Sequence, residues 1–160
     1  MTAEVPKLLT LDTLLERLER HRRQGRRIVF TNGCFDILHV GHVRYLRQAR
    51  RLGDVLVVGL NSDASVRRLK GAGRPIHTLE DRAEILAAFP FITCIVSFDT
   101  DSVEPLIREV RPDVLVKGGD YRISQVVGQK FVRRCGGQVV VLDHVQGRST
   151  TDALKRLGRR

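Results

Sequence analysis

The segment Gly33-Cys-Phe-Asp-Ile-Leu-His-Val-Gly-His42 follows a short apolar run and leads into an amphipathic stretch at residues 42–52. It predicts a strand end that passes through a glycine-bearing turn into a helix. His39 and His42 are three residues apart, so a helical turn would place both imidazole rings on one face. Gly41 lets the backbone approach a ligand closely, and the N–H groups at a helix N-terminus attract phosphate. The segment is therefore a candidate phosphate site.

Two other interpretations of these residues stay open. The histidines would be packed or capping groups at an ordinary helix start, or Cys34 and Asp36 would join them as metal ligands. A structural zinc site normally takes a second pair of ligands from another segment, and the sequence offers no matching Cys or His pair.

Five apolar runs recur along the chain, and they are β-branched and mostly continuous rather than alternating. Such runs are typical of strands that are buried on both faces of a parallel sheet. Helical patterns lie between them, so we predict an α/β, Rossmann-like fold with a parallel sheet of about five strands and helices on both faces. The expected strands are residues 28–30, 55–60, 92–98, 114–116 and 139–142. The expected helices are residues 11–24, 42–52, 79–89, 102–110 and 124–135, with a closing helix from about 150.

A length of 160 residues favours one domain, residues 1–160, in which residues 1–26 form an N-terminal helical extension. Hydrophobic residues make up 42% and charged residues 29% of the chain, which excludes a disordered protein. We expect a cytoplasmic protein, because the N-terminal residues lack the order of a signal peptide and no apolar run is long enough to span a membrane. The three cysteines lack CxxC spacing and fit reduced thiols.

The net charge of +10 suits an anionic partner such as nucleic acid, a phosphorylated metabolite or a membrane surface. The basic residues are spread widely, however, and aromatic residues amount to 5%, which offers no stacking platform for single-stranded nucleic acid. The charge therefore indicates a phosphate ligand without identifying it.

A polar cluster directly follows each apolar run. Carboxyl ends of parallel strands meet at one edge of a sheet, where open α/β sheets bind ligands. We therefore predict a binding edge, although loops that are simply polar would give the same pattern. The clusters are residues 31–36, 61–63, 99–101, 117–121 and 143–151.

These motifs together resemble the HxGH nucleotidyltransferase superfamily, and most closely its heptose 1-phosphate adenylyltransferases. The resemblance spans residues 8–157, and it implies transfer of AMP from ATP to heptose 1-phosphate, giving ADP-heptose for lipopolysaccharide or another surface glycan. The matching segments are TNGCFDILHVGHVRYLRQARRLGD at 31–54, NSD at 61–63, RRLKG at 67–71, RP at 74–75, EDR at 80–82, VKGGDY at 116–121 and GRSTT at 147–151.

The resemblance also implies roles for individual residues. His39, His42 and Lys70 would be catalytic, with Lys70 on a mobile segment that reaches the α-phosphate. Residues for ATP binding would be Asn32, Gly33, Cys34, Phe35, His39, Gly41, His42, Lys117, Gly119, Asp120, Ser149, Thr150 and Thr151. Residues for the phosphate substrate would be Asp36, Asn61, Asp63, Arg74 and Arg82. Mg²⁺ would arrive on the ATP phosphates, with Asp36 as a candidate contact.

Ordinary structural roles compete with several of these assignments. Residues 149–151 would form a routine helix N-cap, and Asp36 would bond nearby turn amides. Arg82 would pair with a neighbouring carboxylate at the helix start, and Lys117 would be a solvated charge at a strand end.

The resemblance implies ATP and heptose 1-phosphate as partners, a homodimer, and binding to neither nucleic acid nor membrane. Fused relatives carry a sugar kinase before this domain, whereas only the expected helix precedes it here, so we expect another protein to phosphorylate the substrate. Glycerol 3-phosphate cytidylyltransferases share GxFDxxHxGH and STT, and are the alternative enzyme. They tend to carry paired aspartates and Trp where this chain has Gly118-Gly-Asp-Tyr121. A basic nucleic-acid-binding module is the alternative outside enzymes.

Overall fold

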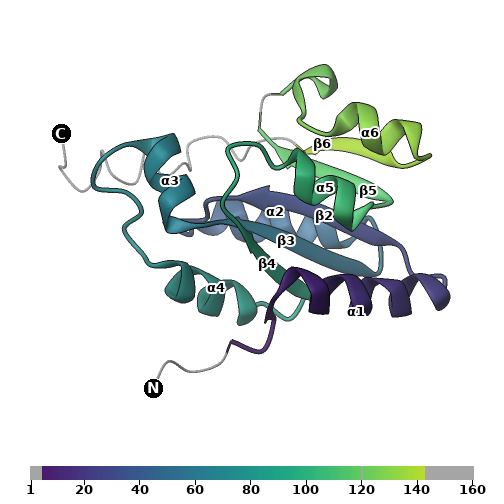
Figure 1. Cartoon of the computed structure of the whole chain (residues 1–160), viewed down its shortest axis with the longest axis horizontal. Coiled ribbons are helices and arrows are strands. Elements are labelled where there is room, and N and C mark those ends of the chain that lie inside the picture. The colour runs from purple at the N-terminus through teal and green to yellow at the C-terminus, as the bar shows by residue number, and fades with distance from the viewer. Residues whose placement is uncertain (1–4, 120, 143–160) are drawn as a thin grey trace.

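Six parallel strands form one sheet in a computed structural model that describes residues 5–119 and 121–142 (Figure 1). The order across the sheet is β1-β4-β3-β2-β5-β6. This confirms the predicted Rossmann-like α/β class. The strands are β1 Leu8–Leu9, β2 Ile28–Gly33, β3 Val55–Asn61, β4 Cys94–Phe98, β5 Val114–Gly118 and β6 Gln138–Leu142.

Helices cover both faces of the sheet, as the continuous apolar runs require. The apolar residues of α1, α5 and α6 join the core on one face, and those of α2 and α4 join the core on the other. The helices are α1 Leu11–Arg23, α2 Val40–Arg50, α3 Asp63–Lys70, α4 Leu79–Ala87, α5 Glu104–Val110 and α6 Gln129–Arg134, with a 3₁₀ turn η1 at Ile123–Gln125.

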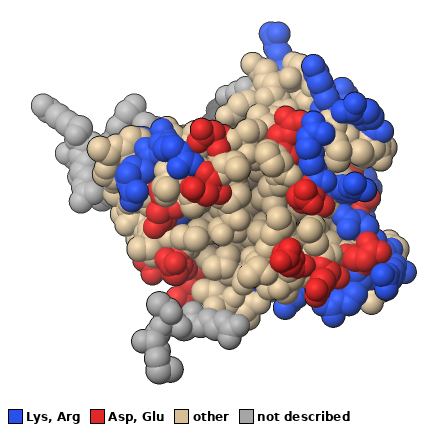
Figure 2. All heavy atoms as spheres, viewed as in Figure 1, with Lys and Arg blue, Asp and Glu red and all other residues tan. Residues whose placement is uncertain are grey.

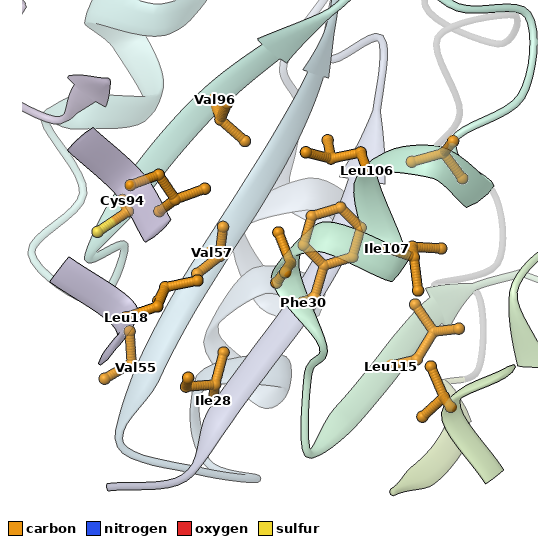
Figure 3. Close-up of a cluster of buried hydrophobic side chains, with 14 of the residues drawn as sticks. Leu18, Ile28, Phe30, Val55, Val57, Cys94, Val96, Leu106, Ile107 and Leu115 are labelled. Atoms are coloured by element: carbon orange, nitrogen blue, oxygen red, sulfur yellow. The ribbon is translucent and has the colours of Figure 1, made fainter. Parts of the chain in front are cut away.

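Successive residues of the central strands alternate between the two cores. Ile28 and Phe30 pack with Leu18 of α1 and Ile107 of α5 on one face (Figure 3), whereas Val29 joins the other core. All of these side chains are fully buried, and each contributes about 1.5–3 kcal/mol relative to an exposed position.

The sheet has one strand more than predicted. Leu8 and Leu9 pair with Ile95 and Val96 of β4, so β1 forms an edge of the sheet instead of belonging to a helical extension. Two residues are too few to show a strand pattern in the sequence.

Two helical segments also differ from the prediction. Residues 63–70 form α3, to which we assigned no helix beyond the polar cluster at 61–63. Ser62 caps this short helix by accepting the N–H of Ser65 at 3.0 Å. The expected helix at 124–135 divides into η1 and α6. Gly128 starts α6 with a φ of +83°, a conformation that would strain other residues.

The central strands β2 and β5 pair over a short stretch and then part. Their pairing covers Val29 with Val114 and Phe30 with Leu115. Beyond this point β2 stays paired with β3 as far as Gly33, and β5 stays paired with β6. The strand order reverses between β2 and β5, and such a reversal leaves a crevice at the carboxyl ends of the strands.

Lys and Arg side chains lie in several separate groups on the face shown in Figure 2, with Asp and Glu side chains between them. The net charge of +10 is therefore not concentrated in one basic patch on this face. Among the described residues, no helix is long and apolar enough to span a membrane.

Arg111→Gly should stabilise the protein, because Arg111 ends α5 with a left-handed φ of +44°. Relief of that conformation outweighs the extra chain entropy of glycine, so we expect a gain of about 0.5–1 kcal/mol in the free energy of unfolding. Urea denaturation measures it. Arg108→Gly, within the same helix, is the matched control and should lose about 1 kcal/mol. Loss of stability in Arg111→Gly would contradict the argument.

Candidate active site

A cleft of about 700 Å³ opens at the carboxyl ends of the parted strands. Four of the five polar clusters contribute residues to this cleft, and the fifth lies outside the described residues. Residues from β2, β3, β5 and the loops that follow them contribute. Predicted site residues that line the cleft are Asn32, Gly33, Cys34, Phe35, Asp36, His42, Asn61, Lys70, Arg74 and Lys117.

The two motif histidines cap the N-terminus of α2. His39 is the N-cap residue, and its Nδ1 accepts the Gly41 N–H at 3.1 Å. The Nδ1 of His42 accepts the His39 N–H at 3.4 Å, and the two ring centroids are 3.9 Å apart. Because Nδ1 accepts in both rings, each neutral imidazole carries its proton on Nε2. Both histidines therefore cap the helix. The caps also orient the two Nε2–H groups at the N-terminus of α2, where backbone N–H groups attract phosphate.

The Asp36 carboxylate organises the loop after α3. Arg74 Nε lies 2.5 Å from its Oδ2, and the backbone N–H groups of Ile76 and His77 donate to its Oδ1 at 2.7 and 3.0 Å. Burial alone would raise the pKa of Asp36, but these hydrogen bonds and the Arg74 charge outweigh it and lower the pKa. The side chain is 3% exposed, so its oxygens are committed to holding the loop.

Arg82 is a fully buried junction between three segments. Its guanidinium donates to the Cys34 carbonyl at 2.6 Å, to the His77 carbonyl at 3.1 Å and to Asp63 Oδ1 at 2.7 Å. Cys34 lies in the turn between β2 and α2, which we call the motif turn. His77 lies in the loop after α3, and Asp63 is the first residue of α3. The geometry thus gives Arg82 and Asp63 a positioning role, different from the local pairing with Glu80 or Asp81 that the sequence suggested.

Two lysines reach the cleft from different elements. Lys70 is the last residue of α3 and is exposed, with the glycine-bearing segment beginning after it, and Lys117 comes from β5. Burial lowers the pKa of Lys117, and the charge of Lys70 adds to this effect, whereas Cys34 opposes it. Burial raises the pKa of the Cys34 thiol despite the nearby Lys70. The cleft is therefore a partly desolvated, cationic site.

Among the predicted residues that the structure describes, those that do not line the cleft are His39, Gly41, Asp63, Arg82 and Gly119. Asn61 is buried, and its amide donates to Ser65 Oγ at 3.0 Å, while Gly119 follows β5 with a φ of +117°. Asp120 and residues 149–151 lie outside the described residues.

Several apolar side chains line the cleft that sequence reasoning did not select. Leu69, Tyr121 and Val127 are all more than 40% exposed, which is unusual for large apolar residues. Apolar residues carry no functional group that would single them out in the sequence. The available clue was their place in the segments that follow β3 and β5. They offer contact area for an uncharged part of a ligand.

No group of three or more His, Cys, Asp or Glu residues within 5–119 and 121–142 is arranged to hold a metal ion. Asp36, the candidate Mg²⁺ contact, is occupied by Arg74 and two amides.

Asp36→Asn should destabilise the protein by about 3 kcal/mol at neutral pH, because it leaves the largely buried Arg74 without its counter-charge. The pKa of Asp36 is lower in the folded than in the unfolded chain. The carboxylate therefore stabilises the fold above the unfolded value of about 3.9, and this contribution is lost as the pH falls through the folded pKa. Urea denaturation at about pH 7 and about pH 3 should show the difference between variant and wild type shrinking in acid.

Asp101→Asn is the matched control, since Asp101 pairs with Arg68 at 2.9 Å but is 86% exposed. It should change the free energy of unfolding little at either pH. A similar effect of both substitutions would contradict the organising role of Asp36.

Curated relatives match nearly the whole chain. It is 57% identical over 144 residues to the bifunctional protein HldE of Alcanivorax borkumensis, covering 90% of this chain and 30% of the relative. Bifunctional protein HldE of Syntrophotalea carbinolica is 55% identical over 151 residues, covering 94% and 31%. That of Pseudomonas aeruginosa is 53% identical over 153 residues, covering 96% and 32%. The chain spans about a third of the length of these relatives.

Solved structures share the fold. A lipopolysaccharide core biosynthesis protein from Thermoplasma volcanium superposes with a TM-score of 0.62 at 26% identity, covering 75% of this chain and 97% of that one. Pantoate-beta-alanine ligase from Francisella tularensis superposes with a TM-score of 0.60 at 14% identity, covering 90% and 68%, and shows likeness of fold alone.

A sequence model of the cytidylyltransferase-like family matches residues 30–145, from the middle of β2 to beyond β6. The match includes the HxGH turn, α3 and the lysine of β5 that together surround the cleft. The expectation from the motifs is confirmed: the chain belongs to the cytidylyltransferase-like family of nucleotidyltransferases.

Proposed function

We propose that this protein transfers AMP from ATP to heptose 1-phosphate, giving ADP-heptose and pyrophosphate for lipopolysaccharide or another surface glycan. The observation that carries the proposal is the cleft between β2 and β5, where His42 at the start of α2 faces the same space as Lys70 and Lys117. Identity above 50% to bifunctional HldE proteins over nine-tenths of the chain supports the choice of substrate, together with the resemblance of the motifs.

The reaction makes specific demands on the site. An oxygen of the sugar phosphate attacks the α-phosphorus of ATP, and the bond from that phosphorus to the bridging oxygen breaks. Pyrophosphate leaves with the electron pair. The nucleophile is already an anion, so no general base is needed, and the protein must position two polyanions and neutralise their charge.

Residues in and beside the cleft would meet these demands. The Nε2–H groups of His39 and His42 and the N-terminus of α2 would donate to phosphate oxygens where charge develops. Lys70 and Lys117 would supply positive charge to the polyphosphate from α3 and β5. Asp36 and Arg82 would act indirectly, since they hold the motif turn, α3 and the following loop in register.

Mg²⁺ and a homodimer are part of this proposal. Mg²⁺ keeps several waters and binds mainly through substrate phosphates. This mode of binding suits the cleft, because the Asp36 carboxylate is held by Arg74 and the Asp101 carboxylate is largely exposed. The ion would offset negative charge on the bound ATP. Light scattering on the purified chain measures whether it forms a dimer.

ATP should serve as donor with a higher kcat/KM than CTP. Phosphorus NMR with each nucleotide, Mg²⁺ and a panel of sugar 1-phosphates should show a new diphosphate ester for ATP with heptose 1-phosphate. The same mixture without sugar phosphate controls for hydrolysis. Faster product formation from CTP and glycerol 3-phosphate would replace this proposal with the cytidylyltransferase alternative.

His42→Ala should lower kcat by about 10²–10³, the effect of removing one preorganised donor from a transition state. His39→Asn separates catalysis from capping, because Asn still accepts the Gly41 N–H at the N-cap position but lacks the imidazole. It should keep the melting temperature and lose kcat as well.

His21→Ala, at the end of α1, is the control and should retain full activity. Near-normal kcat in folded His42→Ala would leave the histidines as caps alone. Loss of a bound transition metal from both variants would instead support the metal interpretation.

A further inference from the structure

Tyr45 of α2 lies at the point where β2 and β5 part. Its hydroxyl hydrogen-bonds Thr31 Oγ1 on β2 and the Val116 carbonyl on β5 at 3.2 Å. Thr31 and Val116 directly follow Phe30 and Leu115, the last residues at which the two strands pair. One side-chain hydroxyl thus bridges the first positions beyond the pairing.

The direction of these bonds follows from their partners. A carbonyl oxygen can only accept, so the Tyr45 hydroxyl donates to Val116, and the fully buried Thr31 hydroxyl donates to Tyr45. Burial raises the pKa of Tyr45 to about 12, so the hydroxyl stays protonated near neutral pH. Ionisation of Tyr45 therefore does not break the bridge near neutral pH.

The Tyr45 ring also fixes the end of β5. A Cβ on Gly118 would lie 2.9 Å from Tyr45 Cε2, so the ring packs directly on the glycine backbone. Tyr45 is three residues after His42 and hence on the same side of α2. The side chain connects the helix that carries the histidines to both central strands.

The two strands form opposite sides of the cleft. Asn32, Gly33 and Cys34 line it from the β2 end, and Lys117 and Gly118 line it from β5. We infer that Tyr45 is a positioning residue that sets the separation of these two sides, and so fits the cleft to a nucleoside triphosphate that contacts both. This inference rests on the proposed function.

Tyr45→Phe tests the bridge, because it keeps the ring on Gly118 and removes the hydroxyl. We expect kcat/KM for ATP to fall about tenfold or more, since small misplacements of reacting groups are costly. The fall should be equal across the pH range, as Tyr45 does not titrate. Backbone hydrogen exchange should increase at residues 31–33 and 116–118. This measurement reports on the strand ends independently of catalysis.

Thr93→Val is the matched control. Thr93 Oγ1 accepts the Leu56 N–H at 3.1 Å near the start of β4, at the opposite end of the sheet from the cleft. Its loss should lower the melting temperature about as much as Tyr45→Phe while leaving kcat/KM within about twofold of wild type. Exchange at the cleft residues should not change.

The outcomes are distinct. If Tyr45→Phe loses no more activity than Thr93→Val, or if exchange at the strand ends is unchanged, the positioning role is refuted. If Tyr45→Phe does not fold, Thr31→Val removes the donor to the Tyr45 hydroxyl and undergoes the same measurements. If the wild type forms no ADP-sugar, the proposed function fails, and calorimetric ATP affinity with hydrogen exchange still decides the role of Tyr45.

Discussion

The parting of β2 and β5 is the constraint on which the rest of the site depends. Each strand remains hydrogen-bonded to its outer neighbour, so the backbone stays regular while the inner edges separate. Buried backbone groups need partners, and the Tyr45 hydroxyl supplies one to Val116 where the ladder stops. The separation creates space for a ligand without interrupting the cores on the two faces.

Buried charged side chains hold together the segments that surround the cleft. Arg82 is among the largest fully buried side chains, and it joins the motif turn to α3 and to the loop that Asp36 holds. A buried ion pair contributes little net stability, because desolvation offsets attraction, but it defines one arrangement of its partners. The exposed Lys70, the last residue of α3, thereby extends from a helix whose position is fixed.

Local sequence patterns predicted much of this architecture. The runs around residues 28, 55, 94, 114 and 139 form strands because β-branched residues buried on both faces leave a continuous apolar signal. The HxGH segment predicts the strand-to-helix turn that lies between β2 and α2. The bridging role of Arg82 does not follow from local patterns, because its partner Cys34 is 48 residues away and the pairing exists only in the folded chain. The bridging role of Tyr45 is likewise absent from local patterns, because its partners Thr31 and Val116 are distant in the sequence.

The lowered pKa of Lys117 would link the binding of a phosphate to proton uptake. In the free protein, burial and the nearby Lys70 favour the neutral amine. A phosphate placed beside it would favour the ammonium form, so the group binds a proton together with its ligand wherever the pH approaches the lowered pKa. Affinity for such an anion would then fall at a lower pH than it would beside a solvent-exposed lysine, and the heat of binding would depend on the ionisation enthalpy of the buffer.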